Sequence, residues 1–591
     1  MTEPLTHRRA ARSIRTAFIG CLTLSLMTTY PVVFAQSTGD SASIRVPLNE
    51  FMPAQPGQTL AEIASYIMPD KSVTLEQMTW ALFIKNPLQF TEDNINSLVH
   101  RPHLAIPSLE EIQATRHEQA VANIARHHTR WADKDAPTGT ALLTQRPQDD
   151  ERPQEQYSIL LFNRPLTIGG EVDAGFRQRK DFSLGRQDDD DLRVSLGVQF
   201  ELLYRLSRNT SLYLEIEPEH RNELHSEDGE TERSTEIELG ELWLHISIPG
   251  NEHLSLQIGR QYFGDAREWW WDEDLDAVRV LYAADKMKAQ LGIGANPRAI
   301  STENDDIDPE DESIVWLLTS ASWQWAKKNY LEAFFLSHFD HSPTPDEGDI
   351  VAEDREDDED AALSWLGLRS RGRLKIGDAG RLHHWLDTGV VYGRSTLIDF
   401  DDIGNDRSEV DQRLDQTVNG WGLDVGIIWD SKLAYEPYFT VSYAMGSGDP
   451  DTDDGIDRSY RQSGLQSNDD KFRGATSFRY YGELLRPELS NLRITTLALG
   501  VPLFEDSSVD LVYHSYRQIH AANRLRDDRL RTNPRGEDRD IGEEYNIILG
   551  LEEWEHVEVE AVAALFRAGK AYGDFSGQTA TSVVVQAEYN F

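Results

Sequence analysis

The chain has 591 residues, with 58 Lys and Arg against 101 Asp and Glu, a formal net charge of -43 and a mean hydropathy of -0.53. This polarity excludes a membrane protein built from many apolar helices, since each spanning helix needs about 20 mainly apolar residues. The negative charge excludes a nucleic-acid partner, because affinity for phosphate backbones comes from clustered Lys and Arg. The apolar and aromatic content excludes a disordered acidic chain, so the protein is expected to fold.

Residues 1–35 are predicted to be a secretory signal peptide. Four arginines between positions 8 and 15 precede an apolar stretch, and Val33-Phe34-Ala35 provides a cleavage site before Gln36. The alternatives are an uncleaved membrane anchor and lipidation at Cys21. Cleavage after residue 35 removes the single cysteine of the chain, which leaves no disulfide and no thiol chemistry.

Residues 44–111 are expected to form a small α+β domain in the periplasm. Apolar residues at helical spacing follow Thr59, and a second helical pattern runs from Thr74 to Asn86, where Pro87 ends it. The run P-G-x-T-L-x-x-I-A, the Asn-Pro pair and the closing L-x-I-P-S resemble the LysM-like segment of FimV-type pilus-assembly proteins. This resemblance implies contact with peptidoglycan; a domain that binds periplasmic proteins and no sugar is the alternative. Residues 112–155 are predicted to be a charged helix and a linker with several prolines.

From residue 156 to residue 591 the hydrophobic pattern has a period of two. Between Leu192 and Leu206, and again between Trp421 and Trp429, apolar residues alternate with polar or charged ones. The segments are about 10 to 15 residues long, enough to cross a bilayer at a tilt. Tight connections alternate with long acidic ones, as in bacterial outer-membrane barrels. The pattern therefore predicts an all-β transmembrane antiparallel barrel of about 18 strands with a polar lumen.

The candidate strands begin near residues 166, 191, 210, 234, 253, 275, 286, 313, 329, 361, 381, 420, 434, 490, 508, 543, 556 and 580. The long connections are expected at residues 299–312, 340–360, 396–419, 447–489 and 519–542.

The most specific motif lies within residues 259–282. Gly259-Arg260-Gln261 is followed by the turn Trp269-Trp270-Trp271-Asp272. This stretch strongly resembles the signature of the alginate export porin family. The resemblance implies an 18-stranded outer-membrane barrel that passes a secreted polyuronate through an arginine-rich constriction, with periplasmic export proteins as further partners.

An anionic polysaccharide channel needs cations in its lumen that hold each sugar weakly, and the arginine fork suits carboxylates. Alternation predicts lumen positions for six arginines, which are Arg193, Arg205, Arg279, Arg369, Arg371 and Arg493. Arg260 shares the parity of the apolar residues Leu256 and Ile258, so a lumen position for it requires a β-bulge near Gly259 or a location beyond the membrane edge. Each of these arginines could instead pair with lumen acids such as Glu201 or Glu215.

Other functions were weighed against a polyuronate channel. An enzyme is not expected, because the chain has no G-x-S-x-G and no H-E-x-x-H motif. A plugged barrel that anchors the envelope and a general anion or oligosaccharide porin are the alternatives. No cofactor is expected; the acidic loops are candidate sites for a divalent cation, although Asp449 to Asp454 lacks the EF-hand pattern and a solvated loop is the alternative.

Overall fold

The computed structural model describes residues 157–591, apart from gaps at 163, 187–188, 208, 226–230, 252, 298–300, 303–308, 310–311, 343 and 555, and scattered residues between 50 and 124. Most of this region belongs to one compact unit that contains Ile168–Phe591, and the N-terminal described residues belong to a second unit. The predicted signal peptide lies outside the described residues. Within the described parts, no helix is both long and apolar enough to cross a membrane.

The N-terminal unit is a small α+β arrangement. Strand β1 (Glu50–Phe51) pairs antiparallel with β2 (Leu104–Ala105), and the helices α2 (Leu75–Lys85) and α3 (Leu109–Gln113) accompany them. Thr74 caps α2, because its hydroxyl accepts from the backbone N–H of Gln77 while the Gln77 side chain accepts from the backbone N–H of Thr74. The likeness of this unit to LysM domains stays a prediction.

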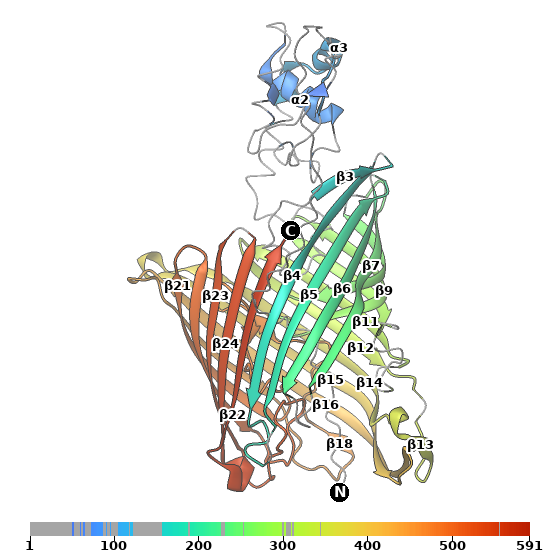
Figure 1. Cartoon of the computed structure of the whole chain (residues 1–591), viewed down its shortest axis with the longest axis vertical. Helices are drawn as coiled ribbons and strands as arrows, with labels where there is room; N and C mark the ends of the chain where they lie inside the picture. Colours follow the sequence, from blue (N-terminus) through green and yellow to red (C-terminus); the bar gives the residue numbers. More distant parts are fainter. Residues whose placement is uncertain are drawn as a thin grey trace, which may run out of the picture. The chain divides into compact units, whose positions relative to one another are not determined.

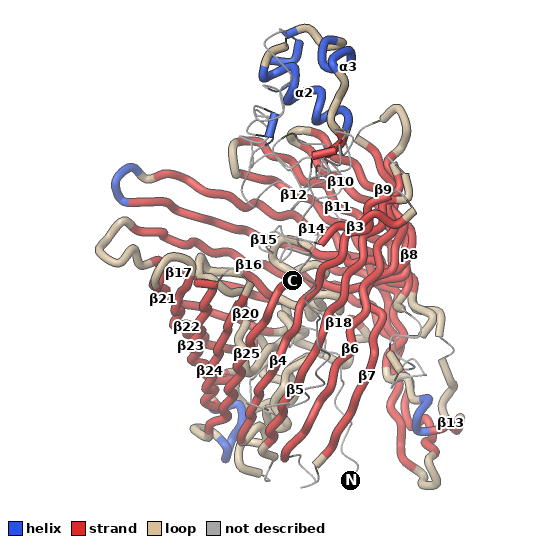
Figure 2. Tube along the Cα trace, turned by 45° about the horizontal axis from the view of Figure 1, so that its top comes forward, coloured by secondary structure: helices blue, strands red, loops and turns tan. Residues whose placement is uncertain are grey.

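The unit that contains Ile168–Phe591 is a closed antiparallel barrel (Figure 1). Among the described residues, 18 strands of its sheet have nine or more residues: β4 (Arg164–Lys180), β5 (Asp191–Arg205), β6 (Thr210–His225), β7 (Glu232–Ser247), β8 (Leu254–Gly264), β9 (Asp272–Ala284), β10 (Met287–Ala295), β11 (Val315–Ala326), β12 (Asn329–Phe339), β14 (Glu359–Lys375), β15 (Gly380–Asp402), β16 (Arg407–Ser431), β17 (Tyr438–Gly446), β21 (Leu492–Leu503), β22 (Ser507–Gln518), β23 (Asp540–Trp554), β24 (Val557–Ala568) and β25 (Thr579–Asn590). Pairing of β25 with β4 closes the barrel, and Figure 2 shows these two strands side by side. The predicted fold and strand number are confirmed.

Shorter elements complete this unit. The strands β3 (Tyr157–Leu161), β13 (Ile350–Ala352) and β18 (Ile456–Asp457) add to the barrel sheet, whereas β19 (Asp469–Asp470) pairs with β20 (Phe478–Arg479) alone. The 3-10 helices η6 (Glu353–Arg355), η7 (Gly377–Ala379) and η8 (Lys570–Phe575) lie in connections.

One predicted loop is wrong. Residues 396–419 were expected to form a long connection, yet β15 and β16 stay paired from Asp402 and Ser408 inward, and only 403–406 turn the chain. The missed part has a polar solvated face with Asp399, Asp401 and Gln412, whereas Ile398 and Val410 on its other face are buried. It has no exposed apolar row of the kind that meets lipid, so it lacks the alternation that marks a spanning segment.

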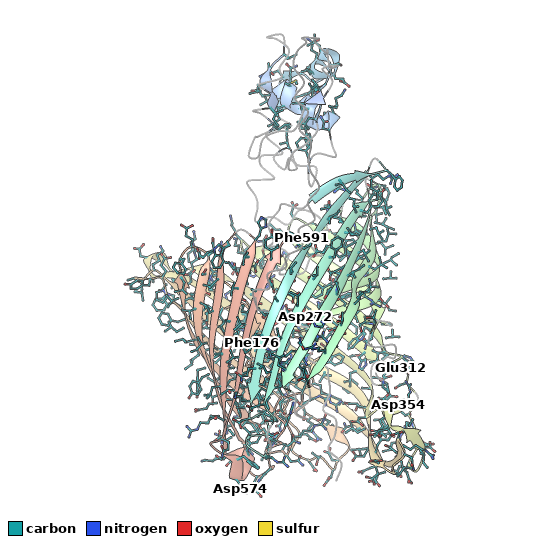
Figure 3. All side chains as sticks on the ribbon, viewed as in Figure 1. Phe176, Asp272, Glu312, Asp354, Asp574 and Phe591 are labelled. Carbon is teal, nitrogen blue, oxygen red and sulfur yellow. The ribbon has the colours of Figure 1, made fainter. Side chains whose placement is uncertain are left out.

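The outer face of the barrel carries an apolar surface. Side chains such as Leu366, Leu368, Val390, Ile427 and Val441 are 44 to 59% exposed, which an isolated soluble protein would avoid over so wide an area. Closure leaves no unpaired strand edge, as a lipid environment requires. Tight connections share one end of the barrel with Phe591, and the longer connections that carry Glu312, Asp354 and Asp574 lie toward the other (Figure 3). We refer to these as the tight-turn end and the long-loop end; the first corresponds to the periplasmic side of such barrels.

Candidate functional site

Two connections from the long-loop end fold into the lumen. They are the tryptophan turn, residues 265–271 between β8 and β9, and the inner loop, residues 447–491 between β17 and β21. Trp269, Trp270 and Trp271 are at most 1% exposed. Trp269 Nε1 donates to Tyr481 Oη at 2.8 Å, and Tyr480 Oη donates to the carbonyl of Arg267 at 2.9 Å. The two segments together narrow the lumen, and we call them the constriction.

Asp265 organises the tryptophan turn. Its Oδ2 accepts from the backbone N–H of Trp270 at 2.7 Å and its Oδ1 from that of Arg267 at 3.0 Å. The same carboxylate pairs with Arg369 of β14. The turn is thereby tied to the barrel wall, which explains why the motif residues leave the strand plane and point inward.

A row of glycines on the lumen wall receives the constriction. Gly367, Gly389, Gly422 and Gly446 are cross-strand partners on four successive barrel strands, from β14 to β17. A Cβ at position 367 would lie 1.8 Å from Trp270 Cζ2, and one at position 422 would lie 2.6 Å from the Tyr460 ring. The absence of side chains on the wall lets these aromatic rings lie directly against the sheet.

The substitution Gly367→Ala is expected to displace Trp270 and to lower the melting temperature, because overpacking of this kind costs about 1 to 3 kcal/mol. The shift is measured by thermal unfolding together with the emission maximum of tryptophan fluorescence. Gly550→Ala is the control, since a Cβ there first meets Ala475 Cβ at 3.1 Å. Equal melting temperatures for the two variants would contradict the proposed role of the glycine row.

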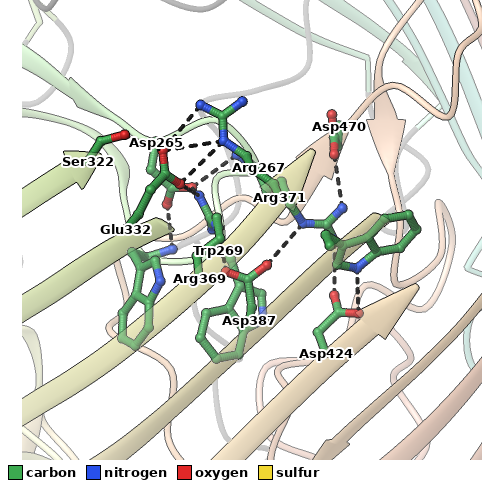
Figure 4. Close-up of polar contacts among 12 residues, drawn as sticks. Asp265, Arg267, Trp269, Ser322, Glu332, Arg369, Arg371, Asp387, Asp424 and Asp470 are labelled. Carbon is green, nitrogen blue, oxygen red and sulfur yellow. Dashed lines mark hydrogen bonds and ion pairs between the residues drawn. The ribbon is translucent and has the colours of Figure 1, made fainter. Parts of the chain in front are cut away.

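Buried ion pairs hold the constriction to the wall (Figure 4). Arg267 contacts Asp424 at 2.9 Å, Asp470 at 3.0 Å and Asp387 at 3.2 Å, and its guanidinium lies over the rings of Trp385 and Tyr480. Burial opposes this charge, yet the three carboxylates and the electron-rich tyrosine raise the pKa of Arg267 above its ordinary value.

The arginines predicted for the substrate path fall into three groups. Arg279, Arg369 and Arg371 lie on the lumen side, since their neighbours Val278, Val280, Leu366 and Leu368 are exposed outside. Arg369 pairs with Asp265, Asp387 and Glu332, and Arg371 with Glu332 at 3.2 Å. Both are structurally paired, as the alternative anticipated: Arg369 holds the tryptophan turn through Asp265, and Arg371 pairs within the barrel wall. Arg279 donates instead to the Tyr262 carbonyl at 3.0 Å and to Gln257 at 3.2 Å.

The second group is Arg193 and Arg205 on β5. Both have the lumen parity of the buried Ser195 and Gln199. Arg193 pairs with Glu223 of β6, whereas Arg205 is exposed at the tight-turn end of the strand.

Arg260 and Arg493 contradict the prediction, because both lie on the outer face. The register of β7, β8 and β9 is continuous at Gly259, with Arg260 opposite Leu242 and Asp276, so the required bulge is absent there. Both partners are exposed outside, and Arg260 Nε donates to Asp276 Oδ1 at 3.0 Å. Arg493 shares the outward parity of Leu497.

The reason for the error at Arg493 is that β21 has apolar residues on both faces. Leu492 and Ile494 look like lipid-facing positions, but they are at most 1% exposed and pack in the core inside the barrel. The remaining motif residue, Gln261, is buried and donates to the Ala277 carbonyl at 2.8 Å. Asp272 accepts from Tyr262 Oη at 2.5 Å.

A cationic cluster that the sequence analysis missed lies beside the constriction. It consists of Arg177 and Arg179 of β4, Arg479 and Arg486 of the inner loop, and Arg529 of the connection between β22 and β23. Burial and the charges of the other four arginines lower the pKa of Arg529 well below its ordinary value. The charges of four arginines therefore act on a fifth at this point of the lumen.

Some carboxylates do pair within this cluster. Asp191 lies 3.6 Å from Arg177 and 3.8 Å from Arg179, Glu483 lies 2.8 Å from Arg486, and Asp469 lies 3.9 Å from Arg479. The parity of β4 could have identified the first two arginines, because Val172, Ala174 and Phe176 alternate with them. The other three arginines stand in loops without periodicity, so no sequence signal placed them.

Three acids in the lumen loops make the packing of the constriction depend on pH. Burial raises the pKa of Asp469, Glu488 and Asp528 to about 7. Each of these carboxyls has a higher pKa in the folded state than the value of about 4 that it has in the unfolded state. Its contribution to stability is therefore fully present at pH values below about 4 and is lost as the pH rises toward 7.

The inner loop is therefore expected to be better protected at pH 5 than at pH 8. Hydrogen exchange of residues 447–491, corrected for the intrinsic pH dependence of exchange, measures this difference. In the double variant Glu488→Gln and Asp528→Asn the difference should shrink, because two of the three titrating groups are gone. Protection that is equal or higher at pH 8 in the unmodified protein would contradict the expectation.

Metal binding finds no support from side-chain geometry in the described parts of the chain, where no group of three or more His, Cys, Asp or Glu is arranged to hold an ion. A divalent cation at the acidic loops stays a prediction.

Comparisons with known proteins agree with the motif. The alginate export family matches residues 164–586. The chain is 25% identical to the alginate production protein AlgE of Pseudomonas aeruginosa over 328 residues, 54% of this chain and 65% of that protein. It is 24% identical to AlgE of Azotobacter vinelandii over 288 residues, 46% of this chain and 57% of that protein. The chain thus spans less than two thirds of the length of these curated relatives.

Among solved structures, OccK5 (OpdH) of Pseudomonas aeruginosa aligns with 72% of this chain and 98% of its own, at 8% identity and a TM-score of 0.42. OccAB1 of Acinetobacter baumannii aligns with 72% of this chain and 96% of its own, at 7% identity and a TM-score of 0.43. The family match runs from the first residue of β4 into β25 and includes the tryptophan turn and the cationic cluster. The chain belongs to the alginate export family.

Proposed function

We propose that the protein is an outer-membrane channel that passes an anionic polysaccharide, an alginate-like polyuronate, through the barrel lumen. The observation that carries this proposal is the cationic cluster, in which four arginine charges act on a fifth and lower its pKa. A polyuronate supplies one carboxylate per sugar, and the planar guanidinium engages a carboxylate through two hydrogen bonds. Several such contacts in sequence allow binding that is favourable and still escapable.

The lumen arginines have different parts in this function. Arg279, Arg193 and Arg205 extend the cationic lining on the wall, whereas Arg369 holds the constriction in place through the buried Asp265. Because the constriction is closely packed, it must move or loosen to let a polymer pass during transport. The N-terminal unit contacts peptidoglycan or periplasmic export proteins.

A plugged barrel that anchors the envelope is the second candidate. It is favoured by one observation, the apolar core inside the barrel, to which the tryptophan turn contributes three tryptophans and the inner loop contributes Tyr460, Phe472 and Leu485. That candidate predicts no ion conductance under any condition.

Single-channel conductance of the full chain in planar bilayers distinguishes these functions. Oligouronates are expected to block the current at concentrations at which neutral oligosaccharides of equal length do not. Current that is indifferent to both sugars would assign the protein to general porins. Absence of current, also after the constriction is loosened at pH 8, would favour the plugged anchor.

A further inference from the structure

Two arginines face each other across neighbouring strands on the outer surface. Arg493, the second residue of β21, is the direct cross-strand partner of Arg517, which stands one residue before the end of β22. Both side chains are exposed. Neither guanidinium forms an ion pair with a carboxylate of the described residues, although Arg517 is also the cross-strand partner of Asp540 on β23. The pKa of the nearby Asp538 is lowered by backbone hydrogen bonds and, to a smaller extent, by the charge of Arg517.

The level of this pair on the barrel follows from the strand register. In the middle of the outer wall, a first row contains Leu499, Leu511 and Ile547, each 38 to 52% exposed. The next row toward the long-loop end contains Leu497, Tyr513 and Tyr545, which are again cross-strand partners. The row after that is polar, with Thr495, Ser515 and Glu543. The arginine pair forms the fourth row.

This order of rows matches the profile of a lipid leaflet. Apolar side chains suit the acyl chains, tyrosines suit the interface, and charged side chains suit the headgroups. Both tyrosine hydroxyls donate to Glu543, at 3.1 Å from Tyr513 and 3.0 Å from Tyr545, so the tyrosines turn toward the polar row. The arginines therefore stand at the level of the headgroups of the leaflet at the long-loop end.

Like charges directly opposite each other in a sheet destabilise it. Two arginines at this position are tolerated where an anion lies between or above them. Arg567 of β24 is also exposed on this face, opposite Glu543 of the polar row. The planar guanidinium of an arginine can hold a phosphate through two parallel hydrogen bonds. Among the described residues, no carboxylate makes such paired bonds to Arg493 or Arg517.

We propose that Arg493 and Arg517 bind the phosphate groups of a lipid in the outer leaflet, as carried by the lipid A part of lipopolysaccharide. The apolar rows below the pair offer a surface for the acyl chains of the same molecule, which free phosphate in solution would not use. The site depends on the barrel being embedded in the membrane and is independent of what passes through the lumen, so failure of the conductance experiment leaves it testable.

Binding of bis-phosphorylated lipid A to the full chain in detergent tests this site, with dephosphorylated lipid A as the matched ligand. The double variant Arg493→Gln and Arg517→Gln is expected to bind the phosphorylated lipid about tenfold or more weakly, because two charge-assisted contacts are lost. Binding of the dephosphorylated lipid should be the same in both proteins. Excess inorganic phosphate should compete only weakly, since it lacks the acyl chains.

Lys432→Gln is the matched control, because Lys432 is an exposed cation in a turn at the opposite end of the barrel. It should bind phosphorylated lipid A as the unmodified protein does. Retention of the folded band on unheated gels shows that the variants keep the barrel. Equal affinity of the folded double variant for phosphorylated lipid A, or an equal loss for Lys432→Gln, would overturn the proposal.

Discussion

Replacing Arg267 with methionine is expected to free the inner loop from the lumen wall and to destabilise the constriction by about 3 to 5 kcal/mol, the cost of leaving buried charges without a partner. Arg267 is 3% exposed and forms ion pairs with Asp387, Asp424 and Asp470 at the same time. Without it, three carboxylates from two barrel strands and the inner loop face one another. Hydrogen exchange of residues 447–491 should accelerate, and the single-channel current should rise.

Arg458→Met is the matched control for this experiment. Arg458 lies in the same inner loop and also pairs with two carboxylates, those of Asp449 and Asp454. Unlike Arg267, however, the side chain of Arg458 is exposed to solvent. Exposed ion pairs contribute little to stability, so hydrogen exchange should hardly change. If Arg267→Met behaved like Arg458→Met, the buried network would not be what holds the constriction.

Reversing the charge of Arg486 and Arg529 to glutamate is expected to weaken the block by oligouronates about 10- to 100-fold, which corresponds to the loss of two carboxylate contacts and the gain of repulsion. Both arginines belong to the cationic cluster beside the constriction. The measurement is the concentration of oligouronate that halves the single-channel current. An unchanged value would remove the cluster from the transport path.

Two further variants keep this experiment interpretable. Arg535→Glu makes the same charge reversal in the connection that holds Arg529, but at an exposed residue paired with the exposed Asp574, and it should leave the block unchanged. Arg529→Gln removes a charge without introducing another. Because neighbouring arginines already lower the pKa of Arg529, this variant relieves repulsion and should stay folded with a weaker block.

Much of the fold could be predicted from local patterns. In a membrane barrel one face of each strand meets lipid, so alternation such as that of Val278 and Val280 with Arg279 reports directly which face is which. The same rule located the strands and identified the lumen side for Arg369 and Arg371. It failed for the far part of the β15–β16 hairpin, where the solvated face is polar and the apolar residues Ile398 and Val410 are buried.

The candidate site was predictable only in part. The residues of the tryptophan turn stand out in the sequence, but their inward direction depends on Asp265 and on a carboxylate-bound arginine of β14, 104 positions away. The cationic cluster joins β4 to two loops that begin about 270 and about 340 residues later, and loops have no period from which direction can be inferred.

The sequence by itself determined the barrel, the number of its strands, the family and the wall positions of most lumen arginines, because the contrast between lipid and water is imposed on each strand separately. Only the tertiary structure decided what fills the lumen. The inner loop buries Leu492 and Ile494 on the inside of β21, and this turns Arg493 outward. The tertiary structure also determined which arginines pair with buried carboxylates and which lie mainly beside other arginines. Pairing between charges depends on distances between segments that are remote in the chain.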